Sequence, residues 1–340
     1  MKRSRVFLTH GPDALANYYG ARALAALEVL AEVHRLPEEV DWTPQSLALA
    51  AAGCQVIVSD RRADAGAELF ARLPELVAVC RCAVDIRNID VAAASAQGIL
   101  VTQASAGFMA SVAEWVLGVM IDASRGISAS VLAYRNGDVP TPLMGRELRG
   151  STLGLIGYGQ IGRCLAGIAT PLGLQVLVAD PHVVVPPGPA RQVTLAQLLA
   201  EADHVVCLAN ASPETESLID AAALARMKPT ACFINASRGN LVDEAALLAA
   251  LDEGTIAAAA LDVGRAPDQM PSPALARHPR VIATPHIGGL TPPAIEHQSM
   301  ETVHQVVEIL QGRAPQGAVN AAQAHRLRRL QTASAKPATP

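Results

Sequence analysis

The sequence predicts an α/β protein with parallel β-sheets, and three observations lead to this prediction. Short runs rich in β-branched residues alternate with Ala- and Leu-rich helical segments over most of the 340 residues. Strands joined by helices in this way lie parallel, in sheets that are covered on both faces. Apolar residues make up 51% of the chain and charged residues 17%, which excludes a disordered chain. The length allows two domains, each with its own core.

The first part of the chain predicts a compact domain with its own sheet. We expect its strands at 6–9, 56–59, 76–80 and 99–102. A helix is expected over 13–33, and each later strand follows a plausible helix. This domain should end near residue 103.

A long apolar segment at 111–125 predicts a helix that links the first domain to a second one. It starts at Ser111 and carries Glu114 three residues later, the pattern of a capping box. The second domain contains six predicted strands with intervening helices, as a complete dinucleotide-binding domain requires. These strands are expected at 153–156, 176–179, 205–209, 232–236, 256–262 and 281–284.

The C-terminal part of the chain predicts one more helix and a tail. The helix, over 292–311, should return to pack on the first domain. From about residue 324 the chain is basic and then rich in Ala, Thr and Pro, which predicts a frayed end.

Composition and charge exclude several classes of function. A net charge of −4 and an aromatic content of 3% give no reason to expect a nucleic acid or membrane partner. The N-terminus lacks the long apolar stretch of a signal peptide, so we expect a cytoplasmic protein. The six cysteines show no metal-binding spacing and are interpreted as small buried hydrophobic residues.

A glycine-rich motif follows the first strand of the second domain. It has glycines at 157, 159 and 162, directly before a helical segment. Gly157 permits a tight turn, Gly159 lets the backbone approach a pyrophosphate, and Gly162 allows close helix–strand packing. The helix start, with Gln160 and Ile161, offers free N–H groups to phosphates. The alternative is a glycine-rich turn that binds no ligand.

An acidic residue stands where the next strand ends, eighteen residues beyond the last of these glycines. The carboxylate of Asp180 can accept hydrogen bonds from both hydroxyls of an adenosine ribose, and it would repel a 2′-phosphate. The sequence therefore predicts NAD, rather than NADP, as the cofactor.

The chain resembles the D-isomer-specific 2-hydroxyacid dehydrogenase family. The segments that carry the resemblance are GRELRG at 145–150, MKP at 227–229, INASRGNLVDE at 234–244, ALDV at 260–263 and TPHIGG at 284–289. The resemblance implies a Rossmann NAD-binding domain, 104–286, inserted into a flavodoxin-like substrate domain, 1–103 plus 287–323. The tail would be 324–340. It also implies an active site between the two domains and a homodimer joined through the NAD-binding domain.

The resemblance also assigns roles to individual residues. Arg238 would bind the substrate carboxylate, and His286 would be the general acid and base, whereas His10, His34, His204 and His325 are interpreted as structural. Asp262 would lie near the nicotinamide carboxamide, with capping of its strand as the alternative. Further cofactor contacts are implied for Ala209, Ala236, Ser237, Gly288 and Gly289.

Three positions depart from the family pattern. The family places a Glu, which pairs with the catalytic His, where this chain has Pro267; the nearest carboxylate is that of Asp268. The loop that receives the substrate carboxylate reads AVDIRNID at 83–90, with Val84, Asp85 and Arg87 as candidate substrate-binding residues. The usual His-x-Pro is Leu-Ala-Asn at 208–210.

Two functions remain compatible with these observations. The first is an NAD-dependent dehydrogenase that transfers a hydride between the nicotinamide and a small 2-hydroxy or 2-oxo acid. The alternative is an NAD(H)-binding sensor with little turnover, which the missing Glu and the altered loop support. Retention of both Arg238 and His286 favours the enzyme.

Overall fold

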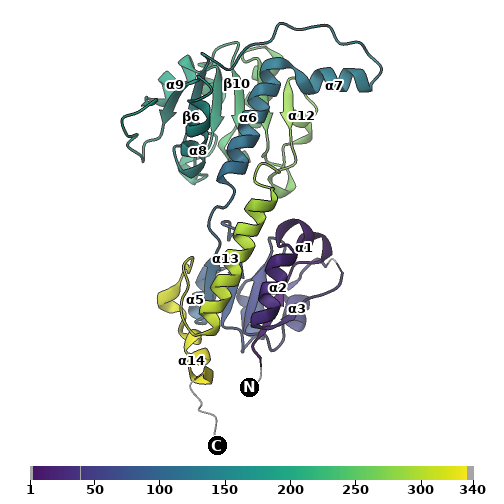
Figure 1. The fold of residues 1–340 in the computed structure, drawn as a ribbon, viewed down its shortest axis with the longest axis vertical. Helices are drawn as coiled ribbons and strands as arrows, with labels where there is room; N and C mark the ends of the chain where they lie inside the picture. Colours follow the sequence, from purple (N-terminus) through teal and green to yellow (C-terminus); the bar gives the residue numbers. More distant parts are fainter. Residues whose placement is uncertain (1–2, 39, 335–340) are drawn as a thin grey trace, which may run out of the picture. The chain divides into compact units, whose positions relative to one another are not determined.

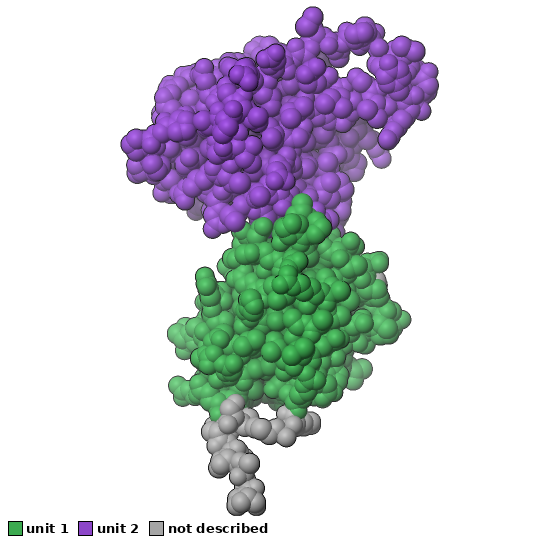
Figure 2. All heavy atoms as spheres, in the orientation of Figure 1, with its two compact units in different colours: residues 1–107, 291–340 green, residues 108–290 purple. Residues whose placement is uncertain are grey.

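The computed structural model describes residues 3–38 and 40–334, and the chain divides into two compact units. Unit 1 comprises residues 1–107 and 291–340, and unit 2 comprises residues 108–290 (Figure 2). Both boundaries lie four residues later than the sequence predicts. The α/β class with two parallel sheets is confirmed.

Unit 1 is built on a five-stranded parallel sheet with the order β2-β1-β3-β4-β5, which is the flavodoxin-like order. The strands are β1 Arg5–Leu8, β2 Glu32–His34, β3 Val56–Ser59, β4 Ala78–Arg81 and β5 Leu100–Gln103. The helices are α1 Pro12–Tyr18, α2 Ala21–Leu30, α3 Pro44–Ala50, α4 Ala67–Arg72, α5 Val91–Ala96, α13 Pro292–Leu310 and α14 Arg328–Ser334.

Unit 2 contains a seven-stranded parallel sheet with the order β12-β11-β10-β9-β6-β7-β8. Its strands are β6 Thr152–Ile156, β7 Gln175–Ala179, β8 Ala190–Gln192, β9 His204–Cys207, β10 Cys232–Asn235, β11 Ala258–Leu261 and β12 Val281–Ala283. Its helices are α6 Met109–Arg125, α7 Ile127–Arg135, α8 Gln160–Ala169, α9 Leu195–Glu201, α10 Ala221–Leu224, α11 Glu244–Asp252 and α12 Pro273–Ala276. The strand order reverses between β6 and β9, and ligands of such sheets bind at this point, beyond the carboxyl ends of the strands.

Each sheet is covered by apolar side chains on both of its faces. In β1, Val6 and Leu8 join a buried cluster with α2 and α13, whereas Phe7 joins a second cluster on the opposite face. In unit 2, Leu155 and Ile156 likewise belong to two different clusters. Successive side chains of a strand point to opposite faces, so a parallel sheet buried on both sides needs continuous apolar strands.

Several expected elements differ from the structure. The predicted helix over 13–33 is two helices followed by β2, because the chain breaks at Gly20, whose φ of +88° favours glycine. The strand β8 was not predicted. The helix α6 begins at Met109, and its N-cap residue Phe108 makes no side-chain cap, so the predicted capping box at Ser111 is wrong.

The prediction of a frayed tail from residue 324 is wrong for the part of the tail that the structure describes. The side chain of Arg326 is buried, and its Nη1 donates to the carbonyl oxygens of Leu73 and Leu76 at 3.1 and 2.8 Å. Leu327 and Leu330 join the core of unit 1. Residues 335–340 lie outside the described residues.

One histidine that the sequence interprets as structural is buried at the start of β9. Loss of solvation on burial lowers the pKa of His204 to about 4. Its imidazole is therefore uncharged at neutral pH, as a core position requires.

Helix α7 and the loop after it extend away from the rest of unit 2 (Figure 1). None of the residues of α7, all of which are described, is buried. Large apolar side chains are exposed along this segment, which we call the apolar arm: Ile127, Val131, Leu132, Tyr134, Val139, Leu143 and Met144. Within the described residues no single helix is suited to span a membrane, and only the bent pair α6–α7, taken together, meets the length and hydropathy criteria.

Candidate active site

The glycine-rich motif occupies the turn between β6 and α8, beside the point where the strand order reverses. Gly157 has a φ of +98°, and a Cβ there would lie 2.8 Å from the carbonyl of Leu208. A Cβ on Gly162 would lie 2.6 Å from the oxygen of Gly157, so helix and turn pack too closely for a side chain. A Cβ on Gly159 would meet nothing within 4 Å.

These glycines leave a cradle that fits a dinucleotide. Gly159 is the N-cap of α8 and has no side chain that could accept from the helix. The first N–H groups of α8, including those of Gln160 and Ile161, therefore face the open side of the turn. A helix start with open space before it can accept a pyrophosphate.

Asp180 lies directly after β7, and its carboxylate is held in place by two backbone amides. Oδ2 accepts from the N–H of Tyr158 at 2.7 Å, and Oδ1 accepts from the N–H of His182 at 2.8 Å. Each carboxylate oxygen has a second lone pair, which leaves it able to accept from a ribose hydroxyl. The bond to Tyr158 also fixes the glycine-rich turn to the next strand.

Arg238 lies in the loop that follows β10, and a buried side chain shapes this loop. Asn235 donates from Nδ2 to the carbonyl of Arg238 at 2.9 Å and accepts from the N–H of Ser237 at 3.1 Å. Ser237 donates to the carbonyl of Ala209 at 2.6 Å, so the ends of β9 and β10 are tied together. Ala236, Ser237 and Ala209 therefore lie at the carboxyl edge of the sheet, where the sequence places cofactor contacts.

His286 lies in the turn after β12 with a φ of +57°, a conformation that costs most residues energy. Its Nδ1 lies 3.1 Å from the main-chain carbonyl oxygen of Asp268. A carbonyl oxygen only accepts, so Nδ1 carries the proton and Nε2 is left to exchange one. Asp268 therefore contacts His286 through its main-chain carbonyl. A role of the Asp268 carboxylate in place of the family Glu stays a prediction.

Asp262 holds the turn that carries His286. It is buried after β11, and its Oδ1 accepts from Thr284 Oγ1 at 2.6 Å and from the N–H of Ile287 at 2.8 Å. Its Oδ2 accepts from the N–H of Gly288 at 2.7 Å. The printed bonds of Asp262 thus go to the turn after β12 and not to its own strand β11. Contact of Asp262 with the nicotinamide stays a prediction.

Gly288 and Gly289 are required by packing around this turn. A Cβ on Gly288 would lie 2.8 Å from Oδ2 of Asp262, and one on Gly289 would lie 3.2 Å from Cβ of Phe108. Both residues place the backbone against neighbours that a side chain would displace.

The loop of unit 1 that should receive a carboxylate contains an internal ion pair. Nη2 of Arg87 lies 2.6 Å from Oδ2 of Asp85, and Nε donates to Oδ1 at 2.9 Å. This bond raises the pKa of Arg87. The pair offsets the negative charge that Asp85 would otherwise present to an anion, and Val84 precedes it in the same loop.

Sequence reasoning missed Asn235, Thr284 and Arg265 as residues that shape the site. Asn235 and Thr284 belong to segments that resemble the family, INASRGNLVDE and TPHIGG, which is a usable signal. Arg265 offers no local signal, because its ion-pair partner Glu216 is 49 positions away.

A Rossmann-type sheet, a glycine-rich cradle and an acidic residue after the second strand define a dinucleotide-binding protein. Comparison with known proteins identifies the family. Residues 117–288 match the NAD-binding domain of the D-isomer specific 2-hydroxyacid dehydrogenases. The chain is 40% identical over 268 residues to an (S)-sulfolactate dehydrogenase from Chromohalobacter salexigens, covering 77% of this chain and 87% of that protein.

The chain is also similar to a further curated protein and to a solved structure. Identity to a D-3-phosphoglycerate dehydrogenase from Mycobacterium bovis is 37% over 262 residues, covering 75% of this chain and only 49% of that longer protein. The crystal structure of the TT0316 protein from Thermus thermophilus superposes with a TM-score of 0.81 at 29% identity, covering 93% of this chain and 99% of that one.

The chain belongs to the D-isomer-specific 2-hydroxyacid dehydrogenases. It is an NAD-dependent oxidoreductase of small 2-hydroxy and 2-oxo acids, and the sensor alternative finds no support among these relatives.

Proposed function

We propose that the chain interconverts a 2-oxo acid and its 2-hydroxy acid with Arg238 as the carboxylate-binding residue and His286 as the general acid and base. The observation that supports this most is the contact between His286 Nδ1 and the carbonyl of Asp268. It fixes the tautomer, so Nε2 gives a proton to the carbonyl oxygen during reduction and takes it back during oxidation.

The guanidinium of Arg238 suits the carboxylate because its planar fork can donate two parallel hydrogen bonds and stays charged. Asn235 bonds to the main-chain carbonyl of Arg238 and so fixes the backbone position from which this side chain extends. We propose that Val84 and Asp85 add backbone N–H groups to the same carboxylate. The pairing of Arg87 with Asp85 favours a structural role for Arg87 over recognition of a second anionic group.

NAD, when bound, accepts or supplies the hydride. In our proposal the start of α8 holds its pyrophosphate and Asp180 holds its adenosine ribose. The residues after β9, β10 and β12 line the nicotinamide end: Ala209, Ala236, Ser237, Gly288 and Gly289.

The test of this function is a panel of 2-oxo acids assayed with NADH by absorbance. The panel should include three-carbon acids with a sulfonate, a phosphate or no second anionic group. We expect steady turnover with at least one of them. Tight NADH binding, measured by calorimetry, without turnover on any 2-oxo acid would instead support the sensor.

The charge of Asp180 should determine the cofactor preference. We expect NADH to be preferred over NADPH by about a hundredfold or more, since an unpaired charge clash costs several kcal/mol. Asp180→Asn removes the negative charge and keeps one side-chain oxygen that can accept from the backbone N–H groups. It should therefore reduce the ratio of kcat/KM with NADH to kcat/KM with NADPH. Asp220→Asn, at the N-cap of α10, is the control and should leave the ratio unchanged. Equal use of both cofactors by the unchanged protein would contradict this prediction.

We propose that the apolar arm joins two copies of the chain. Met144 is 99% exposed and Leu143 77%, and such a concentration of apolar surface marks an interface. Light scattering should give twice the chain mass of 35.4 kDa. The double variant Leu143→Glu, Met144→Glu should halve the measured mass. Val184 is exposed elsewhere in unit 2, and Val184→Glu should leave the measured mass unchanged. A monomeric unchanged protein would exclude the dimer. The cytoplasmic location stays a prediction.

A further inference from the structure

The segment 264–271, which supports His286, is a closed loop after β11. The N–H of Gly264 donates to the carbonyl of Gln269 at 2.8 Å, and the N–H of Ala266 donates to the carbonyl of Met270 at 3.1 Å. At its tip Asp268 and Gln269 both have a φ of +58°. Two successive non-glycine residues in this conformation are costly, so the loop needs contacts that hold it.

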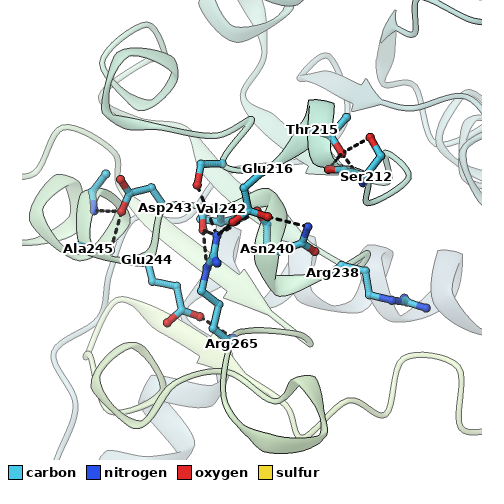
Figure 3. Close-up of polar contacts among 12 residues, drawn as sticks. Ser212, Thr215, Glu216, Arg238, Asn240, Val242, Asp243, Glu244, Ala245 and Arg265 are labelled. Carbon is cyan, nitrogen blue, oxygen red and sulfur yellow. Dashed lines mark hydrogen bonds and ion pairs between the residues drawn. The ribbon is translucent and has the colours of Figure 1, made fainter. Parts of the chain in front are cut away.

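Arg265 supplies these contacts (Figure 3). Its Nη2 donates to Oε1 of Glu216 at 2.7 Å and to the carbonyls of Asn240 and Val242 at 3.0 and 3.2 Å. Its own N–H donates to Oε1 of Glu244 at 2.9 Å. The side chain of Arg265 therefore joins the loop to Glu216, Asn240 and Val242, and its backbone N–H adds the bond to Glu244.

The second carboxylate oxygen of Glu216, the one that does not accept from Arg265, is also hydrogen-bonded. Oε2 of Glu216 accepts from Nδ2 of Asn240 at 3.0 Å. The hydrogen bonds from Arg265 and Asn240 lower the pKa of Glu216. The carboxylate thus remains charged throughout the neutral pH range.

The same segment continues the loop of Arg238. Asn240 is two residues after Arg238, and Figure 3 shows the Arg238 side chain pointing away from the Arg265–Glu216 pair. The two loops also touch through their backbones, because a Cβ on Gly239 would lie 2.1 Å from the carbonyl carbon of Gly264. The side chain of Arg265 is therefore bonded to the segment that continues the Arg238 loop. Arg265 itself belongs to the 264–271 loop, whose Asp268 carbonyl contacts His286.

We propose that Arg265, paired with Glu216, is a positioning residue that fixes the proton-transferring His286 relative to the substrate-binding Arg238. This inference rests on the proposed function. A main-chain carbonyl cannot reorient as a side-chain carboxylate can, so its position depends wholly on the loop that carries it. Arg265 fixes that loop, and with it the orientation of the His286 ring.

The first experiment compares Arg265→Met with Arg191→Met. Arg191 is a matched control, because its Nη2 makes a similar ion pair with Glu201 at 2.8 Å in the same unit. We expect Arg265→Met to lower kcat about 10- to 100-fold, the effect of a misplacement near 1 Å. The Kd for NADH should be unchanged, and Arg191→Met should behave like the unchanged protein. Glu216→Gln removes only the charge of the ion-pair partner and should also lower kcat. This variant keeps the inference testable if Arg265→Met folds poorly. An unchanged kcat in both variants overturns the inference.

The second experiment is a double-mutant cycle with His286→Asn. If Arg265 acts through His286, Arg265→Met should cost almost nothing further once His286 is replaced. An equal fold loss in both backgrounds would overturn the inference, because it would show a general structural role. Failure of the proposed function appears separately, as near-normal turnover of the single variant His286→Asn.

Discussion

Replacing His286 by asparagine is expected to lower kcat by about 10²–10⁴-fold, the usual contribution of a positioned general acid. Asparagine tolerates the left-handed backbone at this position, where φ is +57°, better than alanine does. The variant therefore removes the proton donor without adding much backbone strain. Its Kd for NADH, measured by fluorescence titration, should stay near the unchanged value.

The pH dependence gives a second measure of the same role. Reduction consumes a protonated imidazole, whereas oxidation requires a neutral one. Raising the pH should therefore slow reduction and speed oxidation. Both trends should vanish in His286→Asn. Asp268→Asn keeps the main-chain carbonyl that contacts the imidazole, so we expect it to leave both trends in place. Near-normal turnover of His286→Asn would exclude His286 as the donor.

The sequence predicted both sheets because their strands are buried on two faces and read as continuous apolar runs. It did not predict β2 and β8, each of three residues. β2 follows a helical run without a break in composition, and β8, with the sequence ARQ, lies at the edge of its sheet with two exposed residues. Short edge strands gain their stability from one neighbour, which local sequence does not reveal.

Long-range contacts explain the error at the C-terminus and a contact of His286 that the sequence does not show. Arg326 is ordered because carbonyls some 250 positions away accept its hydrogen bonds. The sequence predicts a carboxylate as the partner of His286, because it shows side chains and not the direction of a backbone carbonyl. The structure places the backbone carbonyl of Asp268 3.1 Å from Nδ1 of His286, and neither this contact nor the positive φ of Asp268 can be read from the sequence.

Replacing Arg238 by methionine is expected to lower kcat/KM by about 10²–10³-fold. Loss of one partner of a desolvated charge pair costs about 2–5 kcal/mol, and each 1.4 kcal/mol corresponds to about tenfold. KM for the 2-oxo acid should rise, because binding of the carboxylate is lost. The value of kcat should fall as well, because the substrate carbonyl is then no longer oriented toward Nε2 of His286.

Arg238→Lys separates charge from shape. A lysine restores the positive charge but not the planar fork, so we expect it to recover only part of kcat/KM. Arg191→Met is again the control, since it removes an arginine of unit 2 that lies outside the loops after β10, β11 and β12. Steady-state kinetics on the best 2-oxo acid, with NADH affinity measured in parallel, completes the test. If Arg238→Met keeps kcat/KM within about twofold, the residue is an ordinary turn arginine, and the substrate carboxylate must be bound by the backbone of the 83–87 loop instead.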